Sequence, residues 1–208
     1  MKNRGIDGLY AITPDLLDTK KLISVTKQAL AGGTKLIQYR NKIADKFMFR
    51  EQAKELQQLC RDFDVPLIIN DHLDIAIELD ADGLHVGQTD VSVSMARHQL
   101  GHDKIIGASC YNQRELAIKA QKDSADYVAF GAFFASVTKP NTTNATIDLL
   151  CEAKAHISVP IVCIGGINLT NAIELVERGC DAIAVSDALF HAHNIRSTAK
   201  QFLGLFKQ

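Results

Sequence analysis

The chain has 208 residues, of which 47% are hydrophobic and 23% charged, and its formal net charge is -1. This composition is typical of a soluble globular protein with one sizeable core, and it gives no overall positive field for nucleic acid or an anionic membrane. No segment approaches the roughly 20 apolar residues of a membrane span, and residues 1–5 lack the apolar core of a signal peptide. We therefore expect a cytoplasmic protein with a single domain, residues 1–208.

The five cysteines are odd in number, scattered, and mostly placed in apolar segments. Such spacing favours buried free thiols in a reducing compartment over a disulfide framework or a zinc site.

Short apolar runs alternate with helix-length segments along the whole chain. The runs predict eight strands: Leu9–Thr13, Lys35–Arg40, Pro66–Asn70, Gly83–Val86, Ile105–Ser109, Tyr127–Phe130, Pro160–Ile164 and Ala182–Val185. Examples of the helices expected between them are Thr19–Ala31, Lys46–Asp62, Gln113–Lys122 and Leu169–Glu177, with Thr19 and Asn168 as N-caps. Eight strand–helix units of about 26 residues predict a compact α/β fold, the parallel (β/α)8 TIM barrel. An open doubly wound sheet is the alternative, but no Gly-x-Gly-x-x-Gly motif follows the first strand.

Charge appears abruptly at the end of the second predicted strand. Gln38, Arg40 and Lys42 alternate along an extended segment, so their side chains should point to the same face. Two cations and an amide at a strand end are poor core residues, but they suit the binding of an anion such as a phosphate.

The third and fourth strands also end in polar residues, Asn70-Asp71 and Gln88-Thr89-Asp90. Asp71 and Asp90 at neighbouring strand ends could hold one Mg²⁺, with diphosphate oxygens and water as further ligands. The alternatives are that Asp71 is a helix N-cap, that Asp90 is a turn residue, and that Asn70 caps a turn. We favour the metal site for the pair and a ligand contact for Asn70.

The fifth strand ends at Ser109, and no His–Asp pair near it suggests a nucleophile, so we assign it a substrate contact. His85 faces the same end, where it could be a general acid or base or a buried barrel histidine. The segment after strand six contains Ser136, Thr138 and Lys139. It could be a lid that closes over an anion or an ordinary surface loop.

The seventh and eighth strands end in Gly165-Gly166 and Val185-Ser186. Barrels often bind a phosphate between these two loops through backbone N–H groups, which glycine allows to approach closely. These residues predict a second anion site, distinct from the one at Arg40.

At these residues the sequence closely resembles the thiamine phosphate synthase family, over nearly its whole length from Leu9 to Ser186. The shared elements, in order, are Gln38-x-Arg40-x-Lys42, Asn70-Asp71, Asp82-Gly83-Leu84-His85-Val86-Gly87-Gln88-x-Asp90, Gly107-x-Ser109, Asp126-Tyr127-Val128, Thr138-Lys139 and Ile164-Gly165-Gly166-Ile167. The resemblance implies that a hydroxymethylpyrimidine diphosphate loses pyrophosphate and is joined to a thiazole phosphate, giving thiamine phosphate through a pyrimidine carbocation.

The resemblance also implies roles for individual residues. Catalytic roles fall on Arg40, Lys139 and Ser109. Arg40, Lys42, Lys139 and one Mg²⁺ per subunit on Asp71 and Asp90 would stabilise the leaving diphosphate. Gln38, Asn70 and Ser109 would hold the pyrimidine, Ser136 and Thr138 would reach the anion or the thiazole, and Gly166, Val185 and Ser186 would bind the thiazole phosphate. A homodimer is the family's expected assembly.

Three residues depart from the family pattern: Ala132 replaces a proline, Ser136 replaces a threonine, and Tyr111 replaces a histidine. None of these changes removes a charged group. Alternatives are a thiazole tautomerase with the same barrel, a phosphosugar isomerase barrel, and a non-catalytic regulatory barrel. Retention of Arg40, Asp71, Asp90 and Lys139 argues against the tautomerase.

Overall fold

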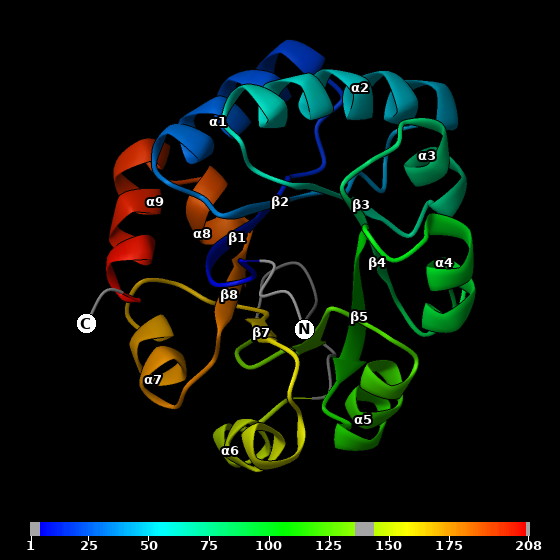
Figure 1. Ribbon diagram of the computed structural model, residues 1–208. Coiled ribbons are helices and arrows are strands. Elements are labelled where there is room, and N and C mark those ends of the chain that lie inside the picture. The colour runs from blue at the N-terminus through cyan, green and yellow to red at the C-terminus, as the bar shows by residue number, and fades with distance from the viewer. Residues whose placement is uncertain (1–4, 136–143, 207–208) are drawn as a thin grey trace.

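The computed structural model describes residues 5–135 and 144–206. Within them eight parallel strands form a closed barrel in chain order, each paired with the next and β8 paired with β1 (Figure 1). The strands are β1 Gly8–Ile12, β2 Leu36–Tyr39, β3 Leu67–Asn70, β4 Gly83–Val86, β5 Ile105–Tyr111, β6 Tyr127–Phe130, β7 Ile161–Ile164 and β8 Ala182–Val185. The predicted TIM barrel is confirmed.

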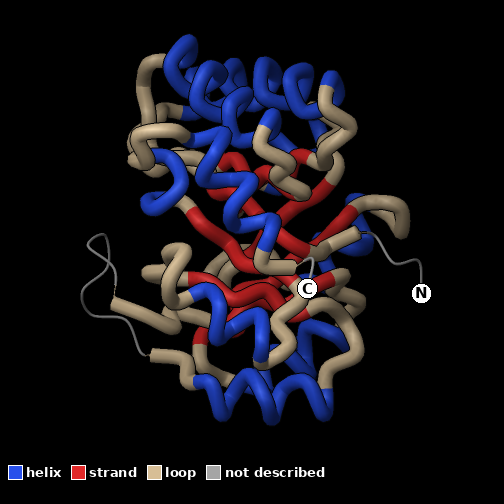
Figure 2. The backbone as a smooth tube through the Cα atoms, turned by 90° about the vertical axis from the view of Figure 1, so that its left-hand side faces the viewer, coloured by secondary structure: helices blue, strands red, loops and turns tan. Residues whose placement is uncertain are grey.

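Helices surround the barrel and separate the strands along the chain, as the end-on and side views show (Figures 1 and 2). They are α1 Thr19–Ala31, α2 Lys46–Asp62, α3 Leu73–Glu78, α4 Val93–Leu100, α5 Arg114–Lys122, α6 Ile147–His156, α7 Ala172–Glu177, α8 Asp187–Phe190 and α9 Ile195–Gly204. In the described part of the chain, none of these helices is long and apolar enough to cross a membrane.

The predicted bounds of α1 are confirmed, but both predicted N-caps, Thr19 and Asn168, are wrong. The N-cap of α1 is Asp18, whose carboxylate accepts from the backbone N–H of Lys21, while the Thr19 hydroxyl accepts from Gln52. Asn168 accepts from the backbone of Thr170 and Asn171 in a turn that precedes α7. Local side-chain bonds of this kind compete with helix formation at the first turn.

The core has two layers, which explains why the strands read as continuous apolar runs. One layer lies between the strands and the helices, and the other fills the barrel with residues such as Ile68, Ile105 and Val162. Gly107 makes room there, because a Cβ at this position would lie 1.9 Å from Cζ of the buried Tyr127. This filling leaves the carboxyl ends of the strands as the place for a pocket.

All five cysteines are free thiols. Four are buried, and Cys151 is exposed.

Candidate active site

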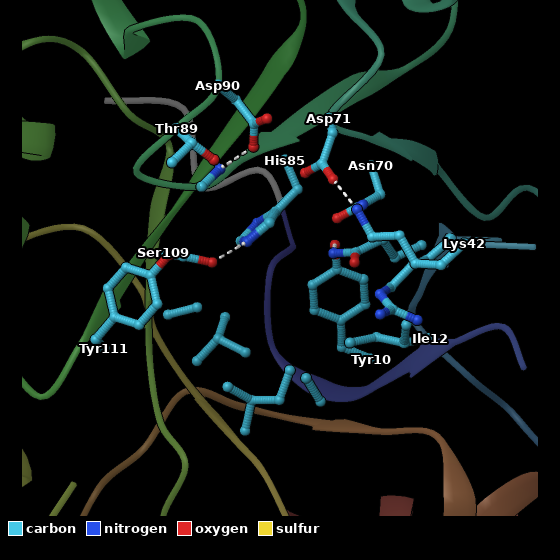
Figure 3. Close-up of a pocket in the computed structure, with 17 residues that line it drawn as sticks. Tyr10, Ile12, Lys42, Asn70, Asp71, His85, Thr89, Asp90, Ser109 and Tyr111 are labelled. Atoms are coloured by element: carbon cyan, nitrogen blue, oxygen red, sulfur yellow. Dashed lines mark hydrogen bonds and ion pairs between the residues drawn. The ribbon is translucent and has the colours of Figure 1, made fainter. Parts of the chain in front are cut away.

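A cavity of about 330 Å³ opens at the carboxyl ends of the strands (Figure 3). It collects seven of the residues singled out from the sequence: Gln38, Arg40, Lys42, Asn70, Asp71, Asp90 and Ser109. Apolar side chains, including Ile12, Val162 and Ile164, form other parts of its wall. The cavity therefore combines a charged rim with a partly apolar interior.

The cationic side of the rim comes from the segment that follows β2. The Arg40 backbone N–H donates to the Thr13 hydroxyl, which donates to the Arg40 carbonyl, both at 3.0 Å. The Arg40 guanidinium lies 3.3 Å from both carboxylate oxygens of Asp15, and Asp15 also accepts from the backbone N–H of Lys42 at 2.8 Å. Asp15 thus holds both cationic residues in place, although the sequence analysis did not select it. Its position just after the first strand is the signal that could have found it.

Asp71 and Asp90 form the acidic side of the rim. Asp71 has a positive φ of 63°, and its backbone N–H donates to the carbonyl of His85 on the neighbouring strand. Its carboxylate lies 2.5 Å from the ammonium of Lys42, whereas Asp90 accepts from the backbone N–H of Gly87 at 2.8 Å. The N-cap of α3 is His72, so the alternative role of Asp71 as that cap is wrong. Asp90 lies in the turn after β4, which was the other alternative for this residue.

The two carboxylates influence each other's charge. Burial raises the pKa of the Asp71 carboxyl, but hydrogen bonds with Lys42 and Asp90 outweigh it, and the net pKa lies below its usual value. Burial raises the pKa of Asp90 above its usual value, and the neighbouring Asp71 raises it further despite the Gly87 N–H. A divalent cation would relieve this repulsion, so the donor set fits Mg²⁺.

The described residues contain no group of three or more His, Cys, Asp or Glu side chains placed to hold a metal ion. If Asp71 and Asp90 held a Mg²⁺ ion, its other ligands would be water and substrate oxygens. This is the usual arrangement at sites where the ion also binds phosphates.

Hydrogen-bonded polar side chains cross the interior below the rim. Gln38 Nε2 donates to the Tyr10 hydroxyl at 2.7 Å, and that hydroxyl lies 2.7 Å from the hydroxyl of Tyr127. The Tyr127 hydroxyl lies 2.9 Å from His85 Nδ1, and His85 Nε2 lies 2.8 Å from Ser109 Oγ. Tyr10 and Tyr127 were given no role from the sequence, although Tyr127 belongs to the Asp126-Tyr127-Val128 element. The sign of a role at both positions is a hydroxyl inside an otherwise apolar strand.

His85 is buried, and both of its ring nitrogens have protein partners. Burial lowers the pKa of its imidazole to about 4, although the negative charge of Asp71 acts in the opposite direction. The histidine is therefore neutral at pH 7. Of the two roles left open for it, the geometry favours the buried barrel histidine.

The second predicted anion site lies beside this cavity, at the ends of β7 and β8. Ile164 and Ala184 are register partners, so Gly166 and Ser186 each lie two residues beyond a paired position. Gly166 has a positive φ of 63°, and its carbonyl accepts from the side chain of Asn171 at 3.0 Å. Gly166, Val185 and Ser186 lie at the strand ends next to the cavity rather than in its lining.

Phe134 and Ala135, in the segment after β6, lie beside Gly166. A Cβ on Gly166 would lie 2.6 Å from the carbonyl oxygens of both Phe134 and Ala135. Ser136, Thr138 and Lys139, which the sequence analysis placed in a lid, lie outside the described residues.

The three departures from the family pattern occupy different places. Ala132 packs against Gly165, where an added Cβ would lie 2.4 Å from the Ala132 Cβ. Tyr111 stands at the cavity rim on the same side as Ser109, across from Lys42 (Figure 3). Ser136 falls outside the described part of the chain.

Comparisons with known proteins agree over nearly the whole length. Residues 9–189 match the family model described as thiamine monophosphate synthase. Thiamine-phosphate synthase of Nitrosospira multiformis is 58% identical over 205 residues, covering 99% of this chain and 88% of the relative. The enzyme of the same name from Nitrosomonas eutropha is 55% identical over 201 residues, covering 97% of this chain and 95% of the relative.

Among solved structures, thiamine phosphate pyrophosphorylase from Pyrococcus furiosus superposes with a TM-score of 0.86 at 33% identity, covering 98% of this chain and 97% of its own. A 3-hexulose-6-phosphate synthase superposes with a TM-score of 0.70 at 14% identity, covering 94% and 98% of the two chains. The second likeness concerns the fold alone.

Proposed function

Because the chain belongs to the thiamine monophosphate synthase family and is a pyrophosphate-releasing transferase of thiamine biosynthesis, we propose how its residues carry out that reaction. The substrates are a hydroxymethylpyrimidine diphosphate and a thiazole phosphate. The carbon–oxygen bond to the diphosphate breaks first, its electron pair leaves with pyrophosphate, and a carbocation remains at the pyrimidine methylene. The thiazole nitrogen then donates its lone pair to that carbon, giving thiamine phosphate.

The observation that carries this assignment of residues is the convergence of two cations and two carboxylates on one cavity. Charge accumulates on the diphosphate as the bond breaks, so preorganised cations at that point stabilise the transition state more than the ground state. Arg40 and Lys42, held by Asp15, are suited to this task. Lys139 adds a third positive charge from the segment after β6.

Asp71 and Asp90 would hold one Mg²⁺ per subunit. When bound, this ion neutralises charge on the diphosphate oxygens. Lys42, which pairs with Asp71 in the free protein, is then able to turn its ammonium to the leaving group.

The pyrimidine end occupies the deeper part of the cavity, beside Gln38, Asn70 and Ser109. Gln38 and Asn70 are buried, and all three side chains line the cavity. Apolar neighbours such as Ile12 and Val162 keep water away from the carbocation, which water would otherwise capture.

The thiazole phosphate binds at the ends of β7 and β8, where Gly166, Val185 and Ser186 offer backbone N–H groups. We propose contacts of Ser136 and Thr138 with the anion or the thiazole, as the family resemblance implies. We also propose a cytoplasmic location and a homodimer, the latter by analogy with the family.

The 58% identity to a thiamine-phosphate synthase favours the synthase over the tautomerase, isomerase and regulatory alternatives. The test is pyrophosphate release by the purified protein, with the two substrates supplied together and singly, with and without Mg²⁺. We expect metal-dependent release with thiamine phosphate formed in step. Binding of the thiazole phosphate without any release would contradict the proposed assignment.

A further inference from the structure

We propose that the buried side chains of Gln38, Tyr10, Tyr127, His85 and Ser109, here called the polar relay, are hydrogen-bonded in one fixed direction. The direction places the imidazole proton on His85 Nε2 and turns the Ser109 hydroxyl proton into the cavity. Ser109 is then a hydrogen-bond donor to the substrate, and Tyr10, Tyr127 and His85 are positioning residues. The identity of that substrate as an aminopyrimidine rests on the proposed function.

The relay crosses the barrel interior from β2 to β5, and its His85–Ser109 end is visible in Figure 3. Tyr10, although it lines the cavity, is 2% exposed and Tyr127 is 0% exposed, so we expect protein groups to satisfy their hydroxyls. An unpaired hydroxyl proton at such a place costs the full desolvation penalty of the group. Each proton of the two tyrosines must therefore have an acceptor within the relay.

The amide of Gln38 sets the direction at one end. Its Nε2 donates to the Tyr10 oxygen, so Tyr10 must direct its own proton to the other neighbour of that oxygen, Tyr127. Tyr127 accepts this bond and passes its own proton to the remaining neighbour, His85 Nδ1. Each group from Gln38 to Tyr127 therefore donates its hydrogen bond to the next member of the relay, ending at His85.

The same count fixes the far end. Because His85 Nδ1 accepts, the ring proton lies on Nε2 and is donated to Ser109 Oγ at 2.8 Å. The Ser109 oxygen is then occupied as an acceptor, and its proton is free for a ligand in the cavity. A ring nitrogen of an aminopyrimidine is an acceptor of the required kind.

A proton on His85 Nδ1 is incompatible with this arrangement. It would be donated to Tyr127, and Tyr127 would then have to direct its proton back to Tyr10. The Tyr10 proton would be left buried and unpaired. The direction of donation along the relay reverses only if the Gln38 amide also rotates, so that its oxygen and not its nitrogen faces Tyr10. Whether Ser109 donates to the ligand therefore depends on the orientation of the Gln38 amide across the barrel.

Gly107 keeps the relay in place from below. It lies two residues before Ser109 on β5, and a Cβ there would lie 2.3 Å from the Tyr127 hydroxyl oxygen. Any larger residue at this position displaces the central member of the relay. This gives a physical reason for the glycine in the Gly107-x-Ser109 element.

The first test is nitrogen NMR of protein labelled with ¹⁵N-histidine, with the His85 signals assigned by their absence from His85→Gln. We expect a protonated Nε2 and an unprotonated Nδ1 that accepts a hydrogen bond. Tyr127→Phe should move the Nδ1 signal, whereas Tyr39→Phe should not, because buried Tyr39 bonds to Gln52 outside the relay. A proton on Nδ1 in the wild-type protein would overturn the proposal.

The second test is a double-mutant cycle on the pyrophosphate-releasing reaction. Tyr127→Phe should lower kcat/KM for the pyrimidine diphosphate roughly tenfold, but should have no further effect in a Ser109→Ala background. Independent effects that multiply would mean that Tyr127 does not act through Ser109. Absence of turnover by the wild type would instead count against the proposed function, and the NMR result would still decide the direction of the relay.

Discussion

The ammonium of Lys42 lies 2.5 Å from Oδ2 of Asp71, and both residues line the cavity. This ion pair occupies, in the ligand-free protein, one of the two carboxylates proposed to hold Mg²⁺. Binding of the metal and a diphosphate would exchange one cation for another at Asp71 and release Lys42 to the leaving group. Under the proposed function, the pair would link metal binding to the position of the Lys42 charge.

Asp71→Asn should weaken Mg²⁺ binding, because an amide supplies a neutral oxygen in place of a charged one. Loss of an outer-shell partner alone costs a metal site 10–100-fold, so we expect the Mg²⁺ concentration for half-maximal pyrophosphate release to rise roughly tenfold or more. The measurement is a Mg²⁺ titration of the initial rate. The thermal stabilisation that Mg²⁺ gives should weaken in parallel, which reports binding without turnover.

Asp74→Asn is the matched control. Asp74 lies three residues from Asp71, is exposed, and pairs with Lys46 on the surface. Its removal should leave the Mg²⁺ titration unchanged. An unaltered titration for Asp71→Asn as well would remove Asp71 from the metal site.

Lys139→Ala should lower kcat on the order of 10²-fold while the protein remains folded. The reason is that a positive charge near the diphosphate is worth most as pyrophosphate leaves, as for other groups that stabilise developing negative charge. Single-turnover rates with both substrates and Mg²⁺ are the measurement, with Lys46→Ala as a surface-lysine control. A normal rate for Lys139→Ala would exclude this residue from catalysis.

Gly166→Ala should impair binding of the thiazole phosphate selectively. The added Cβ would lie 2.6 Å from the Phe134 and Ala135 carbonyl oxygens, so the backbone that surrounds the proposed phosphate site must shift. We expect KM for the thiazole phosphate to rise about tenfold, with a smaller change in KM for the pyrimidine diphosphate.

Gly179→Ala separates this effect from backbone strain. Gly179 also has a positive φ, of 86°, but it precedes β8 at the opposite end of the barrel, and its added Cβ would have no atom closer than 3.8 Å. Both variants should lose stability, since both place alanine in the left-handed region. An equal rise in KM for both would show that strain, and not the phosphate site, is responsible.

The fold could be predicted from the sequence because its signals are local and repeated. Each of the eight strands is an apolar run in a two-layered core, and each observed strand lies within two residues of its predicted bounds. The N-caps were less predictable than the strands. At Thr19 the hydroxyl bonds to the distant Gln52, and only the tertiary structure reveals that competitor for the cap.

The charged residues of the cavity could be predicted because charge at the end of an apolar strand is a conspicuous departure from the pattern. Asp15 and Tyr127 were not predicted as site residues, for two different reasons. Asp15 follows a strand in a loop, where acidic residues are common. Its role in the site comes from its bonds to Arg40 and Lys42, which lie 25 and 27 positions away in the chain. Tyr127 looks like core, and only barrel closure places its hydroxyl between Tyr10 and His85.

The buried state of His85 predicts a pH dependence of stability. In the unfolded chain its imidazole titrates near 6.5, whereas burial lowers the pKa in the folded protein to about 4. Above pH 6.5 the ring is neutral in both states, so it does not change the pH dependence of the free energy of unfolding. As the pH falls from 6.5 towards 4, the imidazole becomes protonated in the unfolded state but stays neutral in the folded state. The free energy of unfolding therefore decreases.

When the pH is below both pKa values, this effect lowers the free energy of unfolding by about 3 kcal/mol. The measurement is the free energy of unfolding by urea at several pH values between 7.5 and 4.5, for the wild type and for His85→Gln. Apart from Asp71, whose charge acts on His85, the carboxylates have the same surroundings in both proteins, so the difference between the two curves reports mainly His85. We expect the wild type to lose more stability than His85→Gln as the pH falls. Parallel curves for the wild type and His85→Gln would show that the imidazole takes up its proton as readily in the barrel as in water, and the neutral histidine of the polar relay would then be wrong.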